Sequence, residues 1–135
     1  MNQETIAVMH ECASRSDNGT ITFPEVVRKL AAIGVEWYHT DLYRAEHTYY
    51  LPSGESHVES MYALTEPVAQ EFSDAGVDAA VRSIQRGQIE YQEFVRRIMA
   101  AGCNGYFVLI TGRKAVYFGR KGEEHVELFP PAPAK

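Results

Sequence analysis

The sequence predicts an α+β protein built from a tandem, pseudo-symmetric repeat of one helix–helix–β-hairpin unit. Shifting the 135-residue chain by 68 residues lays residues 21–60 on 89–128 without a gap, and 13 of the 40 positions are identical. Ordinary composition would give about three identities by chance. In each copy, apolar residues at helical spacing precede a stretch rich in aromatic and β-branched residues, which is typical of helices followed by strands. Because an isolated hairpin is marginal in water, we expect one antiparallel sheet shared by both copies, with the helices mostly on one face.

Each copy starts with two predicted helices. The first helix of the first copy covers residues 3–16. The second helix follows a capping box, in which Thr22 accepts a hydrogen bond from the amide of Glu25 and the Glu25 side chain reaches back. Gly34 supplies the left-handed residue that ends this helix. The second copy repeats the plan, but Glu90 replaces the capping threonine, so its cap is expected to be weaker.

A β-hairpin follows each helix pair. Residues 36–51 and 104–119 are rich in strand-forming residues, with predicted two-residue turns at Arg44-Ala45 and Gly112-Arg113. Short third strands are expected at residues 57–61 and 125–129.

We expect a single domain over residues 1–129. Its repeats cover about 3–61 and 73–129, and residues 62–72 join them. Within this connection, Thr65-Glu66-Pro67 predicts a helix start. The proline-rich residues 130–135 are expected to form a frayed tail.

Composition excludes several classes of protein. Residues 1–81 carry 4 Lys/Arg and 13 Asp/Glu, a balance of −9, whereas residues 82–135 carry 9 and 5, a balance of +4. The acidic half would repel a phosphate backbone, which argues against a nucleic-acid partner. No apolar run reaches the roughly 18–20 residues of a membrane helix, and the N-terminal residues lack a signal core, so we expect a cytoplasmic protein. Cys12 and Cys103 are expected to be reduced and at least partly buried, and no spacing indicates a metal or a cofactor.

The differences between the copies predict where a ligand binds. Alternation along the first hairpin puts Trp37, His39, Asp41, Thr48 and Tyr50 on one face. The second copy has Phe where the first has His39, and Leu where the first has Asp41. We expect Trp37, His39, Asp41 and Tyr50, together with His57, to line a polar, aromatic binding surface. The competing interpretation is a sheet face that is solvated in one copy and covered in the other.

Two other functions fit parts of the sequence. An enzyme would use His39 and Asp41 as an acid–base pair. A winged-helix-like DNA binder would use the second helices, with Arg28-Lys29 or Arg96-Arg97, although only the second copy has a favourable charge balance. A metal site at His39 and Asp41 is not expected, because His47 falls on the opposite face and three convergent ligands are missing.

The run FPEVVRKLAAIGVEWYHTDLYRAEHTYYLPSGES resembles the bacterial and prophage-associated family named domain of unknown function 1398. The resemblance is carried by Phe23-Pro24-Glu25, Gly34-Val35-Glu36, Tyr38 through Asp41, and Thr48-Tyr49-Tyr50. It implies a compact bacterial domain, and it supplies no activity and no catalytic residue.

These observations favour a non-enzymatic module that binds a small molecule or a protein through the sheet face of the first repeat. The alternative is a small enzyme with His39 and Asp41 as its catalytic pair. Neither hypothesis includes a cofactor, a metal or a membrane, and the unpaired hairpin edges favour a homodimer.

Overall fold

The structure of this protein is a computed structural model that describes residues 1–130. It is an α+β fold with four helices and one six-stranded antiparallel sheet in the described residues. The predicted frayed tail, residues 130–135, lies outside the described residues except for Pro130. The elements are α1 (Gln3–Asp17), α2 (Phe23–Ala32), β1 (Trp37–Asp41), β2 (Glu46–Tyr50), β3 (Ser56–Ser60), α3 (Asp74–Gln85), α4 (Tyr91–Ala100), β4 (Gly105–Leu109), β5 (Lys114–Phe118) and β6 (Glu124–Leu128).

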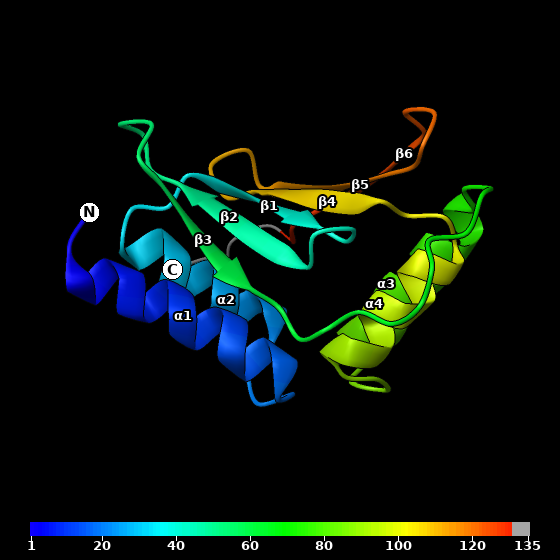
Figure 1. The fold of residues 1–135 in the computed structure, drawn as a ribbon, viewed down its shortest axis with the longest axis horizontal. Coiled ribbons are helices and arrows are strands. Elements are labelled where there is room, and N and C mark those ends of the chain that lie inside the picture. Colours follow the sequence, from blue (N-terminus) through cyan, green and yellow to red (C-terminus); the bar gives the residue numbers. More distant parts are fainter. Residues whose placement is uncertain (131–135) are drawn as a thin grey trace.

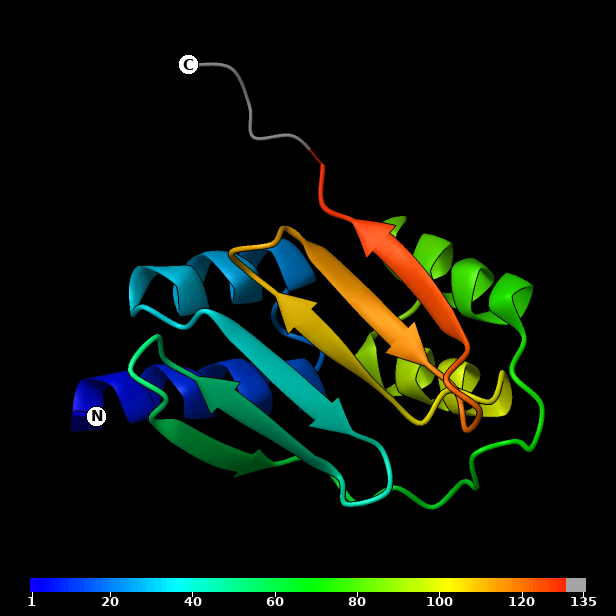
Figure 2. The ribbon, with the colours of Figure 1, turned by 90° about the horizontal axis from the view of Figure 1, so that it is seen from above.

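The sheet has the strand order β3-β2-β1-β4-β5-β6, so the first strand of each half lies at the centre. There β1 pairs with β4, with His39 opposite Phe107 in the middle of the register. The bounds of α2, β1, β2 and β3 each differ by 68 residues from those of α4, β4, β5 and β6. Figure 1 draws the helices below the sheet, and Figure 2 shows α1 and α2 behind its left part and α3 and α4 behind its right part.

The hairpin loops are longer than predicted. Asp41 is opposite Glu46, and Leu109 is opposite Lys114, so each loop has four residues and not two. In the first loop, Oδ1 of Asp41 accepts hydrogen bonds from the backbone N–H groups of Tyr43 and Arg44, which stabilises the wider turn. The register shifts by two residues relative to the prediction. Because side chains alternate with a period of two, the assignment of residues to the two faces is unchanged.

The helix caps agree with the sequence. The side chain of Thr22 accepts from the amide of Glu25 and the Glu25 carboxylate accepts from the amide of Thr22, which is the predicted capping box. Glu90 makes no capping hydrogen bond at the start of α4, so the second cap is weaker, as expected. After α2 and α4, Gly34 and Gly102 have φ of +89° and +83°. Gly34 has open space around it, whereas the backbone carbonyl of Glu71 lies directly against Gly102.

The predicted helix at Thr65-Glu66-Pro67 is wrong, because residues 62–72 contain no helix. Their backbone groups bond to other elements. The amide of Ala69 donates to the carbonyl of Met99 (3.0 Å), and just after this segment the amide of Ser73 donates to the carbonyl of Ala101 (2.7 Å). The Arg120 guanidinium donates to the carbonyl of Val68 (2.8 Å). Tertiary hydrogen bonds therefore replace the local ones that a helix would need.

One hydrophobic core lies between the helices and the sheet. On the strands, the buried side chains alternate with half-exposed ones, so a single face of the sheet contributes to this core. Its residues include Met9, Leu30, Val77 and Ile98 from the helices and Tyr38, Tyr49, Val108 and Tyr117 from the strands. Among the helices of residues 1–130, none is long and apolar enough to cross a membrane.

Candidate functional site

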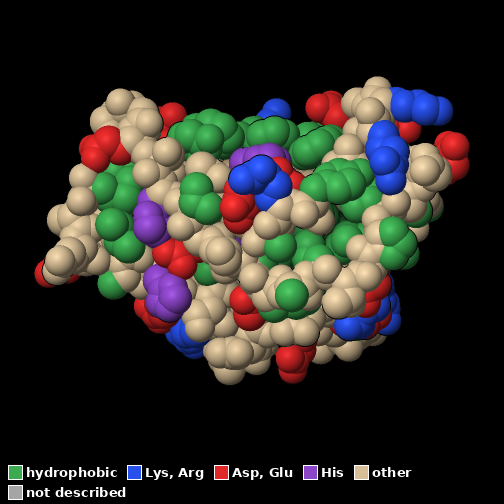
Figure 3. Space-filling view, viewed as in Figure 1, with side chains coloured by type: hydrophobic (Ala, Val, Ile, Leu, Met, Phe, Trp, Pro, Cys, Tyr) green, Lys and Arg blue, Asp and Glu red, His purple; other side chains and the backbone are tan. Residues whose placement is uncertain are grey.

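Four of the five predicted site residues share one face of the sheet. Trp37 is opposite Tyr50, and their rings stack with centroids 4.1 Å apart and an interplanar angle of 8°. Phe107 continues the aromatic layer, with its ring centroid 6.1 Å from that of Trp37 and 4.7 Å from that of His39. We call this side, which carries Trp37, His39, Asp41 and Tyr50, the open face. Figure 3 shows hydrophobic side chains gathered along it at the top of the molecule, with a histidine among them.

No hydrogen bond joins the side chains of His39 and Asp41 in the part of the chain that the structure describes. Burial lowers the pKa of His39, and the Asp41 carboxylate opposes this shift only in part. Within residues 1–130, Nε2 of His39 is buried and has no hydrogen-bond partner. Oδ1 of Asp41 is occupied by two amides of the hairpin turn. His39 therefore packs as part of the aromatic layer, and Asp41 stabilises the turn.

His57 lies on the other face of the sheet. It is opposite Tyr49, whose side chain is buried in the core. Nε2 of His57 lies 2.6 Å from Oε2 of Glu59, and Nδ1 of His10 on α1 lies 2.8 Å from Oε1 of the same carboxylate. His57 is thus separated from the other four predicted residues, and it contributes to a polar contact between β3 and α1.

A concave feature of the described residues lies between the helices and the core side of the sheet. It is a cavity of about 820 Å³, which is within the usual range of small-molecule pockets. All four helices contribute to its walls, and the five predicted site residues do not. The aromatic and aliphatic wall residues include Ile21, Val26, Tyr38, Tyr49, Val81, Ile89, Phe94, Tyr106 and Tyr117.

Three polar residues of this cavity wall, His47, Tyr91 and Tyr106, take part in two hydrogen-bonded pairs. Oγ1 of Thr40 lies 2.7 Å from Nδ1 of His47, and both side chains are buried. The hydroxyls of Tyr91 and Tyr106 are 2.6 Å apart. Thr40 is opposite Tyr106 in the β1–β4 register, so the two hydrogen-bonded pairs are neighbours. We call these four residues, His47, Thr40, Tyr106 and Tyr91, the polar cluster.

Burial keeps the polar cluster uncharged at neutral pH. Desolvation lowers the pKa of His47 to about 4, against a smaller opposing effect of the Glu59 carboxylate. Desolvation raises the pKa of Tyr106 to about 12 and that of Tyr91 well above its usual range. The imidazole is therefore neutral, and the phenols keep their protons as hydrogen-bond donors.

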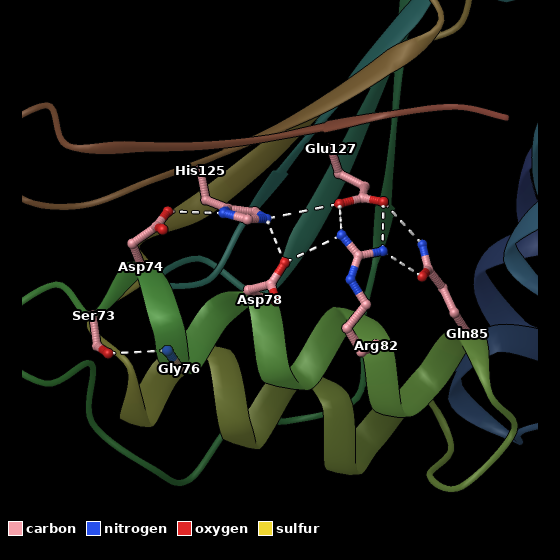
Figure 4. A network of polar contacts seen from close by, with 8 residues as sticks. All are labelled: Ser73, Asp74, Gly76, Asp78, Arg82, Gln85, His125 and Glu127. Atoms are coloured by element: carbon pink, nitrogen blue, oxygen red, sulfur yellow. Dashed lines mark hydrogen bonds and ion pairs between the residues drawn. The ribbon is translucent and has the colours of Figure 1, made fainter.

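A second polar group, shown in Figure 4, joins β6 to α3. His125, Asp78 and Glu127 each offer one ligand atom, and these atoms lie within 4.8 Å of one another. The Arg82 guanidinium, however, lies 2.7 Å from Oε1 of Glu127 and 3.1 Å from Oδ1 of Asp78. Because a cationic side chain already neutralises both carboxylates, a metal ion would have to displace it. The group is an ion-pair network that holds the edge strand to the helix.

The cavity was not predicted, because the predicted site was chosen from positions at which the two copies differ. Tyr38 and Tyr49 are identical to Tyr106 and Tyr117 in the internal alignment. These four tyrosines lie in the core and also form walls of the cavity. His47 was correctly placed on the face opposite His39, where the second copy has Ala115.

No known protein family has a model that matches this chain, and no curated protein matches it either. The resemblance to the domain of unknown function 1398 family therefore stays a prediction.

Proposed function

We propose that this protein is a non-enzymatic binding module that holds a small, mainly apolar molecule in the cavity between the helices and the sheet. The observation that carries this proposal is the cavity of about 820 Å³, with aromatic and aliphatic walls and one buried polar cluster. A concave apolar pocket with a few convergent polar groups is the usual form of a ligand site. Filling such a cavity with a ligand would restore the packing contacts that its lining residues lack.

This site replaces the first-repeat surface as the proposed location of the ligand. The open face is packed with its own aromatic layer, whereas the cavity offers a volume of about 820 Å³ to a ligand. An enzyme with His39 and Asp41 as its catalytic pair is not supported by the contacts of either side chain. A ligand or protein bound to the open face remains the competing outcome of the experiment below.

The experiment compares two tryptophan substitutions at neighbouring positions of β5. Ala115 lines the cavity and is buried, while Val116 points to the opposite face. Phenylnaphthylamine, an uncharged probe whose fluorescence rises in apolar sites, is titrated into the wild type, Ala115→Trp and Val116→Trp. We expect Ala115→Trp to weaken probe binding by about tenfold or more, because the indole fills the cavity, and Val116→Trp to bind as the wild type does.

Unchanged binding by Ala115→Trp would refute the cavity as the site. Loss of binding in Val116→Trp alone would assign the probe to the open face. If Ala115→Trp does not fold, as judged by circular dichroism, Ala13→Leu on the α1 wall of the cavity replaces it. This smaller substitution is expected to weaken probe binding less than Ala115→Trp does. Unchanged binding by Ala13→Leu would refute the cavity as the site, and loss of binding in Val116→Trp alone would assign the probe to the open face.

We also propose that the domain, residues 1–129, consists of two structural repeats, about 3–61 and 73–129, with the helices mostly on one face of the sheet. The matching element bounds support this duplication. So do the left-handed residues Ala45 and Arg113, which have φ of 56° and 57° and are 68 residues apart. All four helices contribute wall residues to the same cavity, which supports their placement on one face of the sheet. The buried free thiols of Cys12 and Cys103 support a reducing, cytoplasmic compartment.

A further inference from the structure

We propose that the cavity selects uncharged ligands with a flat aromatic body and one hydrogen-bonding group that meets the polar cluster. This inference rests on the proposed function and names the chemical class of its ligand.

The aromatic side chains in the cavity walls indicate that the ligand has a flat aromatic body. Rings of Tyr38, Tyr49 and Tyr117 from the strands and of Phe94 from α4 surround the space, and each of these residues is at least nine-tenths buried. Aromatic side chains contact other flat rings favourably in offset or edge-to-face arrangements. Walls contributed by both halves of the sheet therefore suit a planar, multi-ring molecule better than a branched aliphatic chain.

The absence of charge follows from the groups that a ligand would meet. His47 and the phenols of the polar cluster are neutral at physiological pH. Arg82 is a cation of the cavity lining, and both of its terminal nitrogens already contact Glu127, at 2.9 and 2.7 Å. Glu90 is exposed to solvent. An ionised ligand would lose its hydration without gaining an opposite charge of its own, which penalises binding.

The hydrogen-bonding group follows from the unused capacity of the polar cluster. Nδ1 of His47 is bonded to Thr40, and among residues 1–130 no partner engages Nε2, although His47 lines the cavity. In the Tyr91–Tyr106 pair one phenol donates to the other, and Tyr106 also hydrogen-bonds with the Thr40 side chain, so the unused capacity lies at Nε2 of His47. A ligand with a hydroxyl, amine or carbonyl group can use this nitrogen, since a neutral imidazole accepts or donates according to its tautomer.

The test uses a matched pair of probes, phenylnaphthylamine and its sulfonated analogue anilinonaphthalene sulfonate. The two share the aromatic rings and the secondary amine, and they differ in one negative charge. We expect the uncharged probe to bind the wild type about tenfold more tightly or better, because the sulfonate would be buried without a counter-charge. Equal or tighter binding of the sulfonate, abolished by Ala115→Trp, would overturn the inference while leaving the cavity as a ligand site. Binding of neither probe would overturn the proposed function itself.

The polar cluster is tested with His47→Phe, which keeps an aromatic ring and removes both nitrogens. We expect this variant to bind phenylnaphthylamine about 3- to 10-fold more weakly, the usual effect of one lost hydrogen bond. Thr48→Val is the control, because Thr48 is the next residue of β2 and lies on the open face. If His47→Phe does not fold, Tyr91→Phe removes one hydroxyl and keeps the ring. Unchanged affinity in the folded variant would overturn the assignment of the hydrogen-bonding group.

Discussion

His47 should make the protein less stable as the pH falls, and the size of the effect follows from its burial. The imidazole has an ordinary pKa of 6.5 in the unfolded chain and a pKa of about 4 in the folded protein. The unfolded state therefore binds the proton more tightly. The stability that depends on a neutral His47 is fully present above pH 6.5, and it is lost as the pH falls towards 4.

The linkage relation gives the magnitude. A pKa difference of this size corresponds to about 3 kcal/mol when both states are protonated. Between pH 8 and pH 5, where the folded state is still largely unprotonated, the wild type should lose about 2 kcal/mol of its unfolding free energy through this one group. An amide cannot titrate, so His47→Gln should not show this loss, and it can still hydrogen-bond to Thr40.

The assay is urea denaturation of the wild type and His47→Gln at several pH values from 5 to 8. Comparison of the two proteins removes the contribution of every other titrating group. His39→Gln, on the open face, is the control and should keep the pH dependence that belongs to His47. Parallel stability profiles for the wild type and His47→Gln would refute the reasoning, as would an NMR titration that gives His47 a midpoint near 6.5.

Three further predictions concern stability and reactivity. Thr22→Ala should lower the unfolding free energy by about 1 kcal/mol, because it removes the side-chain cap of α2, and an equal stability in urea would contradict that role. Gly34→Ala should lower the unfolding free energy by about 1–2 kcal/mol, because Gly34 has a left-handed backbone conformation that alanine adopts only with strain. Gly102→Ala should lower the unfolding free energy by about 1–3 kcal/mol more than Gly34→Ala does, because the added methyl group would meet the backbone carbonyl of Glu71. Calorimetry of both variants tests whether Gly102→Ala is the less stable one. Burial raises the pKa values of Cys12 and Cys103 to about 11. Both thiols should therefore react with Ellman's reagent about a hundredfold more slowly in the native protein than in urea. Rapid labelling of the native protein would show that the thiols are accessible.

Local sequence signals predicted most of the secondary structure. The Thr22–Glu25 capping box and the left-handed Gly34 depend on residues within one turn of the helix ends, so they could be identified without tertiary information. The hairpin loops were predicted two residues too short. In the first loop, the amides of Tyr43 and Arg44 donate to Oδ1 of Asp41, a contact that strand-forming composition does not reveal. The helix predicted at Thr65-Glu66-Pro67 failed because distant elements satisfy that backbone.

The location of the proposed site was not predicted, because alternation assigns residues to the two faces of the sheet and does not measure the volume that side chains surround. Trp37, His39, Asp41 and Tyr50 were correctly assigned to one face. The polar side chains on that face made it the predicted ligand site. The cavity lies on the other side of the sheet, where His47 contributes to its wall.

By itself, the sequence determined the order and type of the helices and strands and the alternation of side chains between two faces. These properties depend on residues a few positions apart, where backbone geometry leaves few choices. Only the tertiary structure decided that β1 pairs with β4, that a cavity lies between the helices and the sheet, and that His47, Tyr106 and Tyr91 from β2, β4 and α4 line it. Such features depend on how side chains from distant segments fill or leave space, which no local pattern encodes.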